Sequence, residues 1–171
     1  MRIKIQEIGS EGLDIHTSLN PGYLTNIDEI DVKNQGTRIT SNILLDLEVT
    51  KVLREINISG FVSFSIKSPC ARCLIPVNDD INQEIRLVIL PIENLPERDG
   101  DVDYETYEGD EIELSNYIGE VVSISLPQKI LCREECNGLC QFCGINQNTD
   151  SCSCDVKWND PRFEALRNIK L

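Results

Sequence analysis

Eight cysteines, at spacings typical of metal ligands, are the residues of this chain best suited to chemistry. They are Cys70, Cys73, Cys132, Cys136, Cys140, Cys143, Cys152 and Cys154. Eight thiols divide into two sets of four, which is the number of ligands in a closed tetrahedral zinc site. Two of the pairs are Cys-x2-Cys, a spacing that lets one tight turn offer two thiolates to one ion. The sequence therefore predicts two zinc ions, each held by four cysteines.

The spacing allows two ways of grouping the thiols. In the first, Cys140 and Cys143 form a local site with Cys152 and Cys154, which leaves Cys70 and Cys73 to pair with Cys132 and Cys136. In the second, Cys132 and Cys136 join the local cluster and one pair is left poor in metal. The first grouping is favoured because it leaves no thiol unpaired.

Three other uses of cysteine compete with zinc. Disulfides are disfavoured because the N-terminus alternates polar and apolar residues, unlike a signal peptide, and no segment is apolar enough to span a membrane. The chain is thus predicted to be cytoplasmic, where thiols stay reduced. Iron–sulfur clusters are disfavoured because the mixed spacings match neither ferredoxin pattern. A redox dithiol at Cys70 and Cys73 is disfavoured because it would open a helix in a βαβ unit, which the pattern lacks.

The rest of the chain offers little catalytic chemistry. It contains one histidine, His16, and no nucleophile motif or phosphate-binding loop. All-cysteine zinc sites are normally structural, whereas catalytic zinc keeps an open position. We therefore expect a protein that is not an enzyme.

Charge is concentrated in one segment. Of a formal net charge of −13, residues 92–113 contribute −9, from ten acidic residues and one basic residue. The negative electrostatic field of this segment opposes long-range attraction to nucleic acid. It favours encounter with basic proteins, of which ribosomal proteins are one class. The Cys-rich end, residues 127–171, is locally neutral, with six basic and six acidic residues. Candidates for a local RNA contact are Arg72, Lys129, Arg133, Lys157 and Arg162.

The hydrophobic pattern predicts an α+β fold in three parts. Residues 1–91 alternate apolar and polar residues in several runs, which predicts an antiparallel β meander or partial barrel. Within this part, residues 9–26 resemble a loop that contains His16, and Gly60 suggests a bulge. Residues 92–113 are predicted to be an exposed acidic loop.

Residues 114–171 are predicted to hold a packed helix and the Cys-rich zinc-binding segment. Leu114, Tyr117, Ile118, Val121 and Val122 form one apolar helical face. Asp110 and Glu113 resemble a capping box at its start, and Pro127 ends it. A short terminal helix is predicted from Pro161.

The ordered motifs resemble the YceD family, once called domain of unknown function 177. They are Cys70-Ala-Arg-Cys73-Leu-Ile-Pro76, Leu126-Pro127, Leu131-Cys132, Cys136-Asn-Gly-Leu-Cys140-x2-Cys143-Gly144-x-Asn146-x-Asn148, Cys152-x-Cys154 and Asp160-Pro161-Arg162. Gln141 and Gln147 depart from the family's proline and leucine, but neither is an expected ligand. The resemblance implies a role in accumulation of large-subunit ribosomal RNA, and it brings no catalytic residues.

Two hypotheses from different classes follow. The first is a non-enzymatic ribosome-biogenesis factor that supports accumulation of large-subunit (23S) ribosomal RNA and contacts that RNA or a pre-ribosomal particle. The alternative is an acidic carrier for a basic ribosomal protein, motivated by the acidic run. A metal-storing or thiol-redox protein is a third hypothesis. The sequence does not indicate the oligomeric state.

Overall fold

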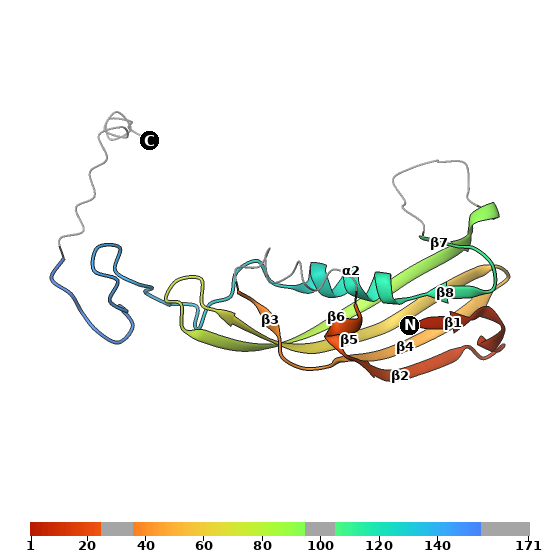
Figure 1. The fold of residues 1–171 in the computed structure, drawn as a ribbon, viewed down its shortest axis with the longest axis horizontal. Coiled ribbons are helices and arrows are strands. Elements are labelled where there is room, and N and C mark those ends of the chain that lie inside the picture. The colour runs from red at the N-terminus through yellow and green to blue at the C-terminus, as the bar shows by residue number, and fades with distance from the viewer. Residues whose placement is uncertain (25–35, 95–104, 155–171) are drawn as a thin grey trace, which may run out of the picture.

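A computed structural model of the chain describes residues 1–24, 36–94 and 105–154. These residues form mostly β-sheet, together with one α-helix (Figure 1). Within those ranges, no helix combines the length and the apolar character needed to cross a membrane.

Three long antiparallel strands form the centre of the fold. They are β4 (Ile43–Val52), β5 (Glu55–Pro69) and β6 (Pro76–Pro91), joined in sequence order as a meander. Alternation along β4 and β5 places every second side chain in the core, as at Ile43, Leu45 and Leu47. The predicted alternating runs are thus real strands with one buried and one exposed face.

Three shorter strands extend this sheet. β2 (Leu13–Leu19) pairs antiparallel with β4, β3 (Arg38–Ile39) pairs antiparallel with β5, and β7 (Glu105–Tyr107) pairs parallel with β6. The prediction of a loop over residues 9–26 is therefore wrong for β2, because the glycines and the one proline there, Pro21, flank the strand and leave its backbone able to pair.

The sheet is open. Its strand order is β2-β4-β5-β6-β7, and among the described strands β2 and β7 do not pair to close a barrel. The predicted meander is present, and the described strands do not close it into a barrel. Gly60 marks no bulge either, since it pairs in continuous register with Leu47 and Ile85. Its φ of +145° and a Cβ that would lie 2.0 Å from the carbonyl oxygen of Asp46 explain the glycine instead.

A second, two-stranded sheet joins the N-terminus to the acidic segment. β1 (Arg2–Lys4) pairs antiparallel with β8 (Glu111–Glu113), and Ile3 and Ile112 are both buried. The prediction that residues 92–113 form one loop is therefore wrong where β7 and β8 form, because isolated apolar residues among the acids reach the core. The part of that run at 95–104 lies outside the described residues.

The helix α2 (Ser115–Ser125) packs against one face of the large sheet through Ile118 and Val122 (Figure 1). The predicted capping box does not form, because Leu114 is the N-cap and makes no side-chain capping bond. Glu113 instead lies on β8, where its carboxylate accepts hydrogen bonds from Arg2 and Ser115. The predicted helix from Pro161 lies outside the described residues.

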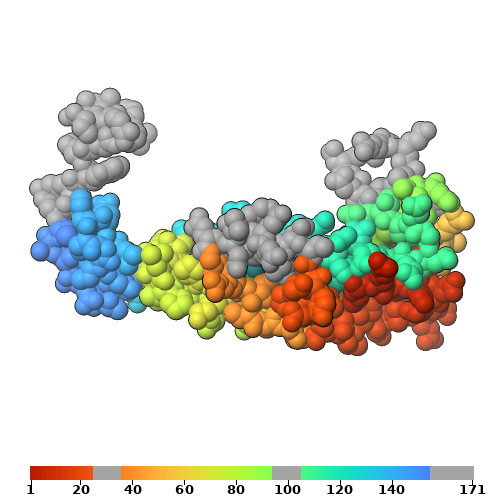
Figure 2. Space-filling model, in the orientation of Figure 1, coloured from red at the N-terminus to blue at the C-terminus, as the bar shows by residue number. Residues whose placement is uncertain are grey.

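The length of β5 and β6 positions the Cys-rich segment. Pairing of β5 with β4 ends at Ser63, whereas pairing with β6 continues to Pro69. The hairpin tip therefore projects beyond the core, and the Cys-rich residues extend from it at one end of an elongated molecule (Figure 2). The space-filling view shows these residues beside the β5–β6 tip and far from the N-terminus.

Candidate metal centre

The eight cysteines lie in two groups of four at this end of the molecule. Cys70, Cys73, Cys132 and Cys136 form the first cluster, and Cys140, Cys143, Cys152 and Cys154 form the second. Within each cluster, the sulfur atoms all lie within 4.8 Å of one another. This is the first of the two groupings that the spacing allows, in which no thiol is left unpaired.

Distances in the first cluster suit a single tetrahedral ion. The sulfur atoms of Cys70 and Cys136 are 3.8 Å apart, and those of Cys73 and Cys132 are 3.6 Å apart. Four thiolates about 2.3 Å from a central zinc ion would lie about 3.8 Å from one another. The donor atoms are thus close enough to bind one ion together.

The tip of the β5–β6 hairpin supplies the first two thiols. The backbone N–H of Cys70 donates to the carbonyl of Ile75 at 2.8 Å, and the N–H of Leu74 donates to the carbonyl of Cys70 at 3.0 Å. These bonds close a tight turn in which Leu74 has a φ of +61°. The turn directs both sulfur atoms toward the same point.

The second cluster repeats this turn. The N–H of Cys140 donates to the carbonyl of Ile145 at 2.8 Å, and the N–H of Gly144 donates to the carbonyl of Cys140 at 2.8 Å. Gly144, with a φ of +73°, occupies the position of Leu74 in the first turn. The pattern Cys-x2-Cys-x-Ile, present twice in the sequence, is the signal that could have identified this repeat.

Backbone contacts bring residues 130–136 beside the hairpin tip. The N–H of Ala71 donates to the carbonyl of Ile130 at 2.8 Å, and the N–H of Cys132 lies 3.4 Å from the sulfur of Cys70. The guanidinium of Arg72 donates to the carbonyl of Cys136 at 2.8 Å. Two chain segments about sixty residues apart are thereby joined around one cluster.

Gly138 allows the chain to remain close to the tip after Cys136. The N–H of Leu139 donates to the carbonyl of Arg72 at 3.1 Å. Gly138 has a φ of +78°, and a Cβ there would lie 3.1 Å from the same carbonyl oxygen. Glycine therefore serves both the left-handed backbone and the close approach.

The clusters differ in exposure. Cys70, Cys73 and Cys136 are buried and pack with Val77, Leu131 and Leu139 in a small apolar cluster. In the second cluster, Cys140 is buried, Cys152 and Cys154 are half-buried, and Cys143 is exposed. The first cluster is therefore shielded from solvent, whereas the second is open to it on one side.

The surroundings favour thiolates at two positions. Burial disfavours the thiolate of Cys70, but the backbone N–H groups of Arg72, Cys73 and Cys132 outweigh it and lower the pKa of Cys70 to about 6. The N–H groups of Cys143 and Phe142 lower the pKa of Cys140 to about 6 against the effect of burial. Thiolate is the form that binds metal.

Other thiols of the same clusters shift the opposite way. Burial and the neighbouring thiols raise the pKa of Cys132 to about 12, and the neighbouring Cys143 and burial raise that of Cys154 to about 12. Four thiolates in one cluster therefore require a cation among them. The donor set is chemically suited to a thiophilic ion.

Asn148 links the two clusters. Its side-chain N–H lies 3.3 Å from the sulfur of Cys136, and its Oδ1 accepts from the guanidinium of Arg133 at 2.6 Å and the N–H of Asn137 at 2.9 Å. The sequence did not predict that Asn148 contacts Cys136. An asparagine between two cysteine pairs carries no signal of which sulfur atom its side chain will contact.

Three of the predicted RNA-contact residues lie near the first cluster. Arg72 and Arg133 are exposed and make the contacts described above, and exposed Lys129 lines a hollow of about 420 Å³ together with Cys70 and Leu74. The fold around the first cluster thus gathers basic residues from two separate segments. Lys157 and Arg162 lie outside the described residues.

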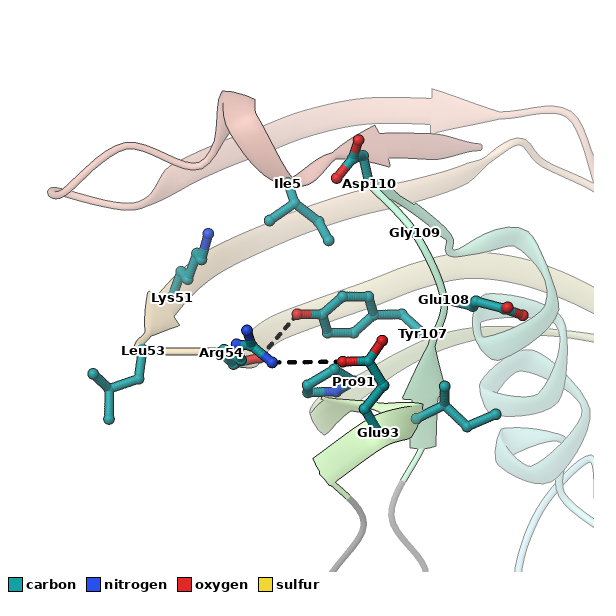
Figure 3. Close-up of a pocket in the computed structure, with 11 residues that line it drawn as sticks. Ile5, Lys51, Leu53, Arg54, Pro91, Glu93, Tyr107, Glu108, Gly109 and Asp110 are labelled. Atoms are coloured by element: carbon teal, nitrogen blue, oxygen red, sulfur yellow. Dashed lines mark hydrogen bonds and ion pairs between the residues drawn. The ribbon is translucent and has the colours of Figure 1, made fainter.

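Another hollow, of about 340 Å³, lies at the opposite end of the sheet, between the β4–β5 turn and β7 (Figure 3). The hydroxyl of Tyr107 donates to the carbonyl of Arg54 at 3.1 Å, and the guanidinium of Arg54 lies 3.7 Å from the carboxylate of Glu93. These contacts connect the β4–β5 turn to β7.

His16 lies on β2, away from the cysteine clusters, and its Nδ1 is 2.9 Å from a carboxylate oxygen of Asp46.

Comparison with known proteins identifies similar sequences. A family model described as "Large ribosomal RNA subunit accumulation protein YceD" matches residues 58–170. A maize protein named "Large ribosomal RNA subunit accumulation protein YCED homolog 1, chloroplastic" is 25% identical over 148 residues, which cover 70% of this chain and 50% of that protein.

Mycobacterial proteins are also similar. An uncharacterized protein of Mycobacterium tuberculosis is 32% identical over 109 residues, which cover 59% of this chain and 49% of that protein. An uncharacterized protein of Mycobacterium leprae is 30% identical over 105 residues, which cover 61% of this chain and 48% of that protein. The chain thus spans about half the length of these relatives. No solved structure matches the chain significantly.

Proposed function

This chain belongs to the YceD family, and we propose on that basis that it is a non-enzymatic cytoplasmic factor supporting accumulation of large-subunit (23S) ribosomal RNA. The family description and the name of the maize relative support a ribosome-related role. The arrangement of the Cys-rich end suggests how such a factor could present a surface to RNA or to a pre-ribosomal particle.

We further propose that each cysteine cluster holds one zinc ion. The support is a donor set of four sulfur atoms, all within 4.8 Å of one another, without histidine or carboxylate. Four thiolates around one ion fit this spacing better than a two-iron cluster, in which the irons would separate the thiolates into two pairs. Zinc would supply the charge that keeps four thiolates together, and no position is left for a catalytic water.

The observation that carries the proposal is the joining of residues 70–73 to residues 130–136 around the first cluster. Arg72, Lys129 and Arg133 lie at or beside this junction. The Cys-rich residues are at the opposite end of the molecule from the acidic strands β7 and β8 (Figure 1). Basic residues gathered on a rigid scaffold can contact phosphate even when the net charge of the protein is negative.

Depletion of the protein in its native host tests this function. We expect 23S ribosomal RNA to fall relative to 16S ribosomal RNA, and the wild-type chain to restore it. A His16→Gln variant, changed on β2 far from the clusters, should also restore it, whereas a Cys70→Ser/Cys73→Ser variant should not. Normal 23S levels after depletion would contradict the proposal.

A second candidate is a carrier for a basic ribosomal protein. Its support is the acidic run, of which Glu105, Glu108 and Glu111 lie in or beside β7 and β8. Loss of that client from the soluble fraction before any change in 23S ribosomal RNA would favour the carrier over the RNA-contact function.

A further inference from the structure

Among the residues that the structure describes, the outer edge of β6 has a neighbouring strand over only a small part of its length. β6 pairs with β5 along its whole length, from Pro76 opposite Pro69 onward, but pairs with β7 only at Ile89–Pro91. Among the described strands, none pairs with the other side of residues 76–88. The register with β5 is continuous, so no bulge turns this edge away.

The backbone of this edge faces outward at alternate residues. The N–H of Asp80 donates to the side chain of Asp79 at 3.1 Å, and the carbonyl of Glu84 accepts from the side chain of Gln83 at 3.0 Å. In an antiparallel pair, residues that bond to the partner alternate with residues that point away from it. The outward-facing residues are therefore Asn78, Asp80, Asn82, Glu84, Arg86 and Val88.

The edge has few of the usual protections against pairing. Exposed edges are commonly blocked by lysine, proline or a bulge. Residues 77–88 contain neither lysine nor proline, and their charges are mainly acidic, at Asp79, Asp80 and Glu84. These carboxylates repel acidic strands and attract basic ones. They therefore favour pairing with a basic strand and do not prevent pairing altogether.

The two faces beside the edge differ in chemistry. On the face covered by α2, Val77, Ile81 and Leu87 are only half-buried and pack against the core. On the opposite face, Asp80 and Glu84 are exposed, where Asp80 accepts from the hydroxyl of Ser65 at 2.6 Å and Glu84 lies 2.7 Å from the guanidinium of Arg86. A strand added here would place alternate side chains against apolar groups and the intervening ones beside carboxylates.

We infer that the β6 edge binds an extended segment of another protein in which apolar residues alternate with lysine or arginine. The segment would add a strand to the sheet, with main-chain hydrogen bonds to residues 78–88 and cross-strand pairs to Asp80 and Glu84. This site lies on the sheet and not on the cysteine clusters, so it does not depend on zinc or on the ribosomal proposal.

A second copy of the chain fits the edge poorly. If two β6 strands paired about a twofold axis at Asn82, Asp80 of each copy would face Glu84 of the other. Like charges directly opposite each other destabilise a strand pair. The net charge of −13 adds repulsion between copies. Charge complementarity therefore favours a basic partner.

Fluorescence anisotropy with synthetic peptides tests the inference. The probe is a peptide as long as the open edge that alternates lysine with valine or threonine, and its controls are the glutamate version and a proline-interrupted lysine version. We expect only the uninterrupted lysine peptide to bind the full chain. NMR should show the perturbed amides along residues 78–88.

Variants separate edge pairing from general charge attraction. Asp80→Asn/Glu84→Gln should weaken binding about three- to tenfold, as expected for two exposed cross-strand charge pairs. Asp14→Asn/Glu48→Gln removes two acids from the same exposed face on β2 and β4, and it should leave binding unchanged. Asn82→Pro should abolish binding because it removes an outward N–H without breaking the ladder to β5.

Three results would overturn the inference. They are no binding of the lysine peptide, equal weakening by both charge variants, and equal binding of the proline-interrupted peptide. A dimer in sedimentation velocity that Asn82→Pro dissociates would assign the edge to a second copy instead. Circular dichroism of each variant controls for folding, and the charge variants keep the test valid if Asn82→Pro unfolds.

Discussion

The side-chain amide of Asn148 lies 3.3 Å from the sulfur of Cys136. Asn148 follows Cys143 and precedes Cys152, so a residue from the loop of the second cluster contacts a predicted ligand of the first. An N–H that donates to a thiolate stabilises its charge, and this contact helps to lower the pKa of Cys136 against the opposing effect of burial. The two clusters are thus structurally coupled.

Asn148→Ala should weaken zinc binding at the first cluster about 10- to 100-fold, the usual effect of losing a residue that supports metal ligands. Competition with a chromophoric chelator measures this affinity. Thr149→Ala is the matched control, because Thr149 is exposed and bonds only locally to Asn146 and Asp150. Equal affinities for the wild type and Asn148→Ala would show that the contact does not support the metal.

Removing two thiols should remove one zinc ion. Cys70→Ser/Cys73→Ser should halve the zinc content measured by mass spectrometry of the purified chain, because the second cluster lies in a separate group of four. Cys152→Ser/Cys154→Ser should also halve it, and combining both pairs should remove all zinc. Loss of both ions from either double variant, or of none, would contradict the grouping.

Two glycines of the Cys-rich segment should respond differently to alanine. Gly144→Ala should cost about 1 kcal/mol, the price of a left-handed backbone, because no atom lies within 4 Å of its Cβ position and Leu74 adopts the same conformation in the first turn. Gly138→Ala should cost about 2–3 kcal/mol, because its Cβ would also crowd the carbonyl of Arg72.

Denaturant unfolding of the metal-loaded chain measures the two costs. A probe in the Cys-rich segment, such as the cobalt-to-thiolate absorption of the cobalt-substituted protein, reports this region separately from the sheet. Similar destabilisation by the two substitutions would mean that the approach of Gly138 to Arg72 contributes nothing.

Much of the central sheet could be predicted from sequence, because β4 and β5 each have one buried and one exposed face. Period-2 alternation records that arrangement directly. β7 could not be predicted, since three residues in a parallel pair carry no readable period and depend on the neighbouring strand. β2 was hidden by Thr17, a polar residue at a position where the alternation requires an apolar one, and by Gly12 and Asn20 at the two ends of the strand.

For the site, spacing predicted the Cys-x2-Cys pairs, because each pair is a local turn, but it left two groupings of the eight cysteines open. The grouping that leaves no thiol unpaired is the one present. The supporting contacts are not local. Arg72 meets the carbonyl of Cys136, and Gly138 meets the carbonyl of Arg72, only after the hairpin tip has approached residues 130–139. The capping box was wrongly predicted for the same reason. The carboxylate of Glu113 accepts a hydrogen bond from Arg2, a contact between residues far apart in the sequence.

Glu113 should make stability depend on pH in acid. The amino group of Met1, then Arg2 and Ser115, lower the pKa of Glu113 from 4.5 to about 2. Because folding favours the ionised carboxylate, its contribution is fully present above pH 4.5 and is lost as the pH falls toward 2. Glu113 is partly exposed, so this contribution should stay below about 1 kcal/mol.

Glu113→Gln should therefore lower the free energy of unfolding at pH 7 but not near pH 2. Thermal melts across this range measure the difference, and Glu111→Gln on the same strand is the control. A destabilisation by Glu113→Gln that is the same at pH 7 and pH 2 would show that the charge of Glu113 is not responsible.

Ultraviolet crosslinking of the tagged protein to RNA in growing cells, followed by sequencing, tests the central claim most directly. We predict a discrete cluster of sites on 23S ribosomal RNA or its precursor, weakened by Lys129→Gln and unchanged by His16→Gln. Because Lys129 is exposed beside the first cluster, its loss should reduce contact without unfolding the site. No enrichment of large-subunit RNA over background would contradict direct RNA contact by the Cys-rich end.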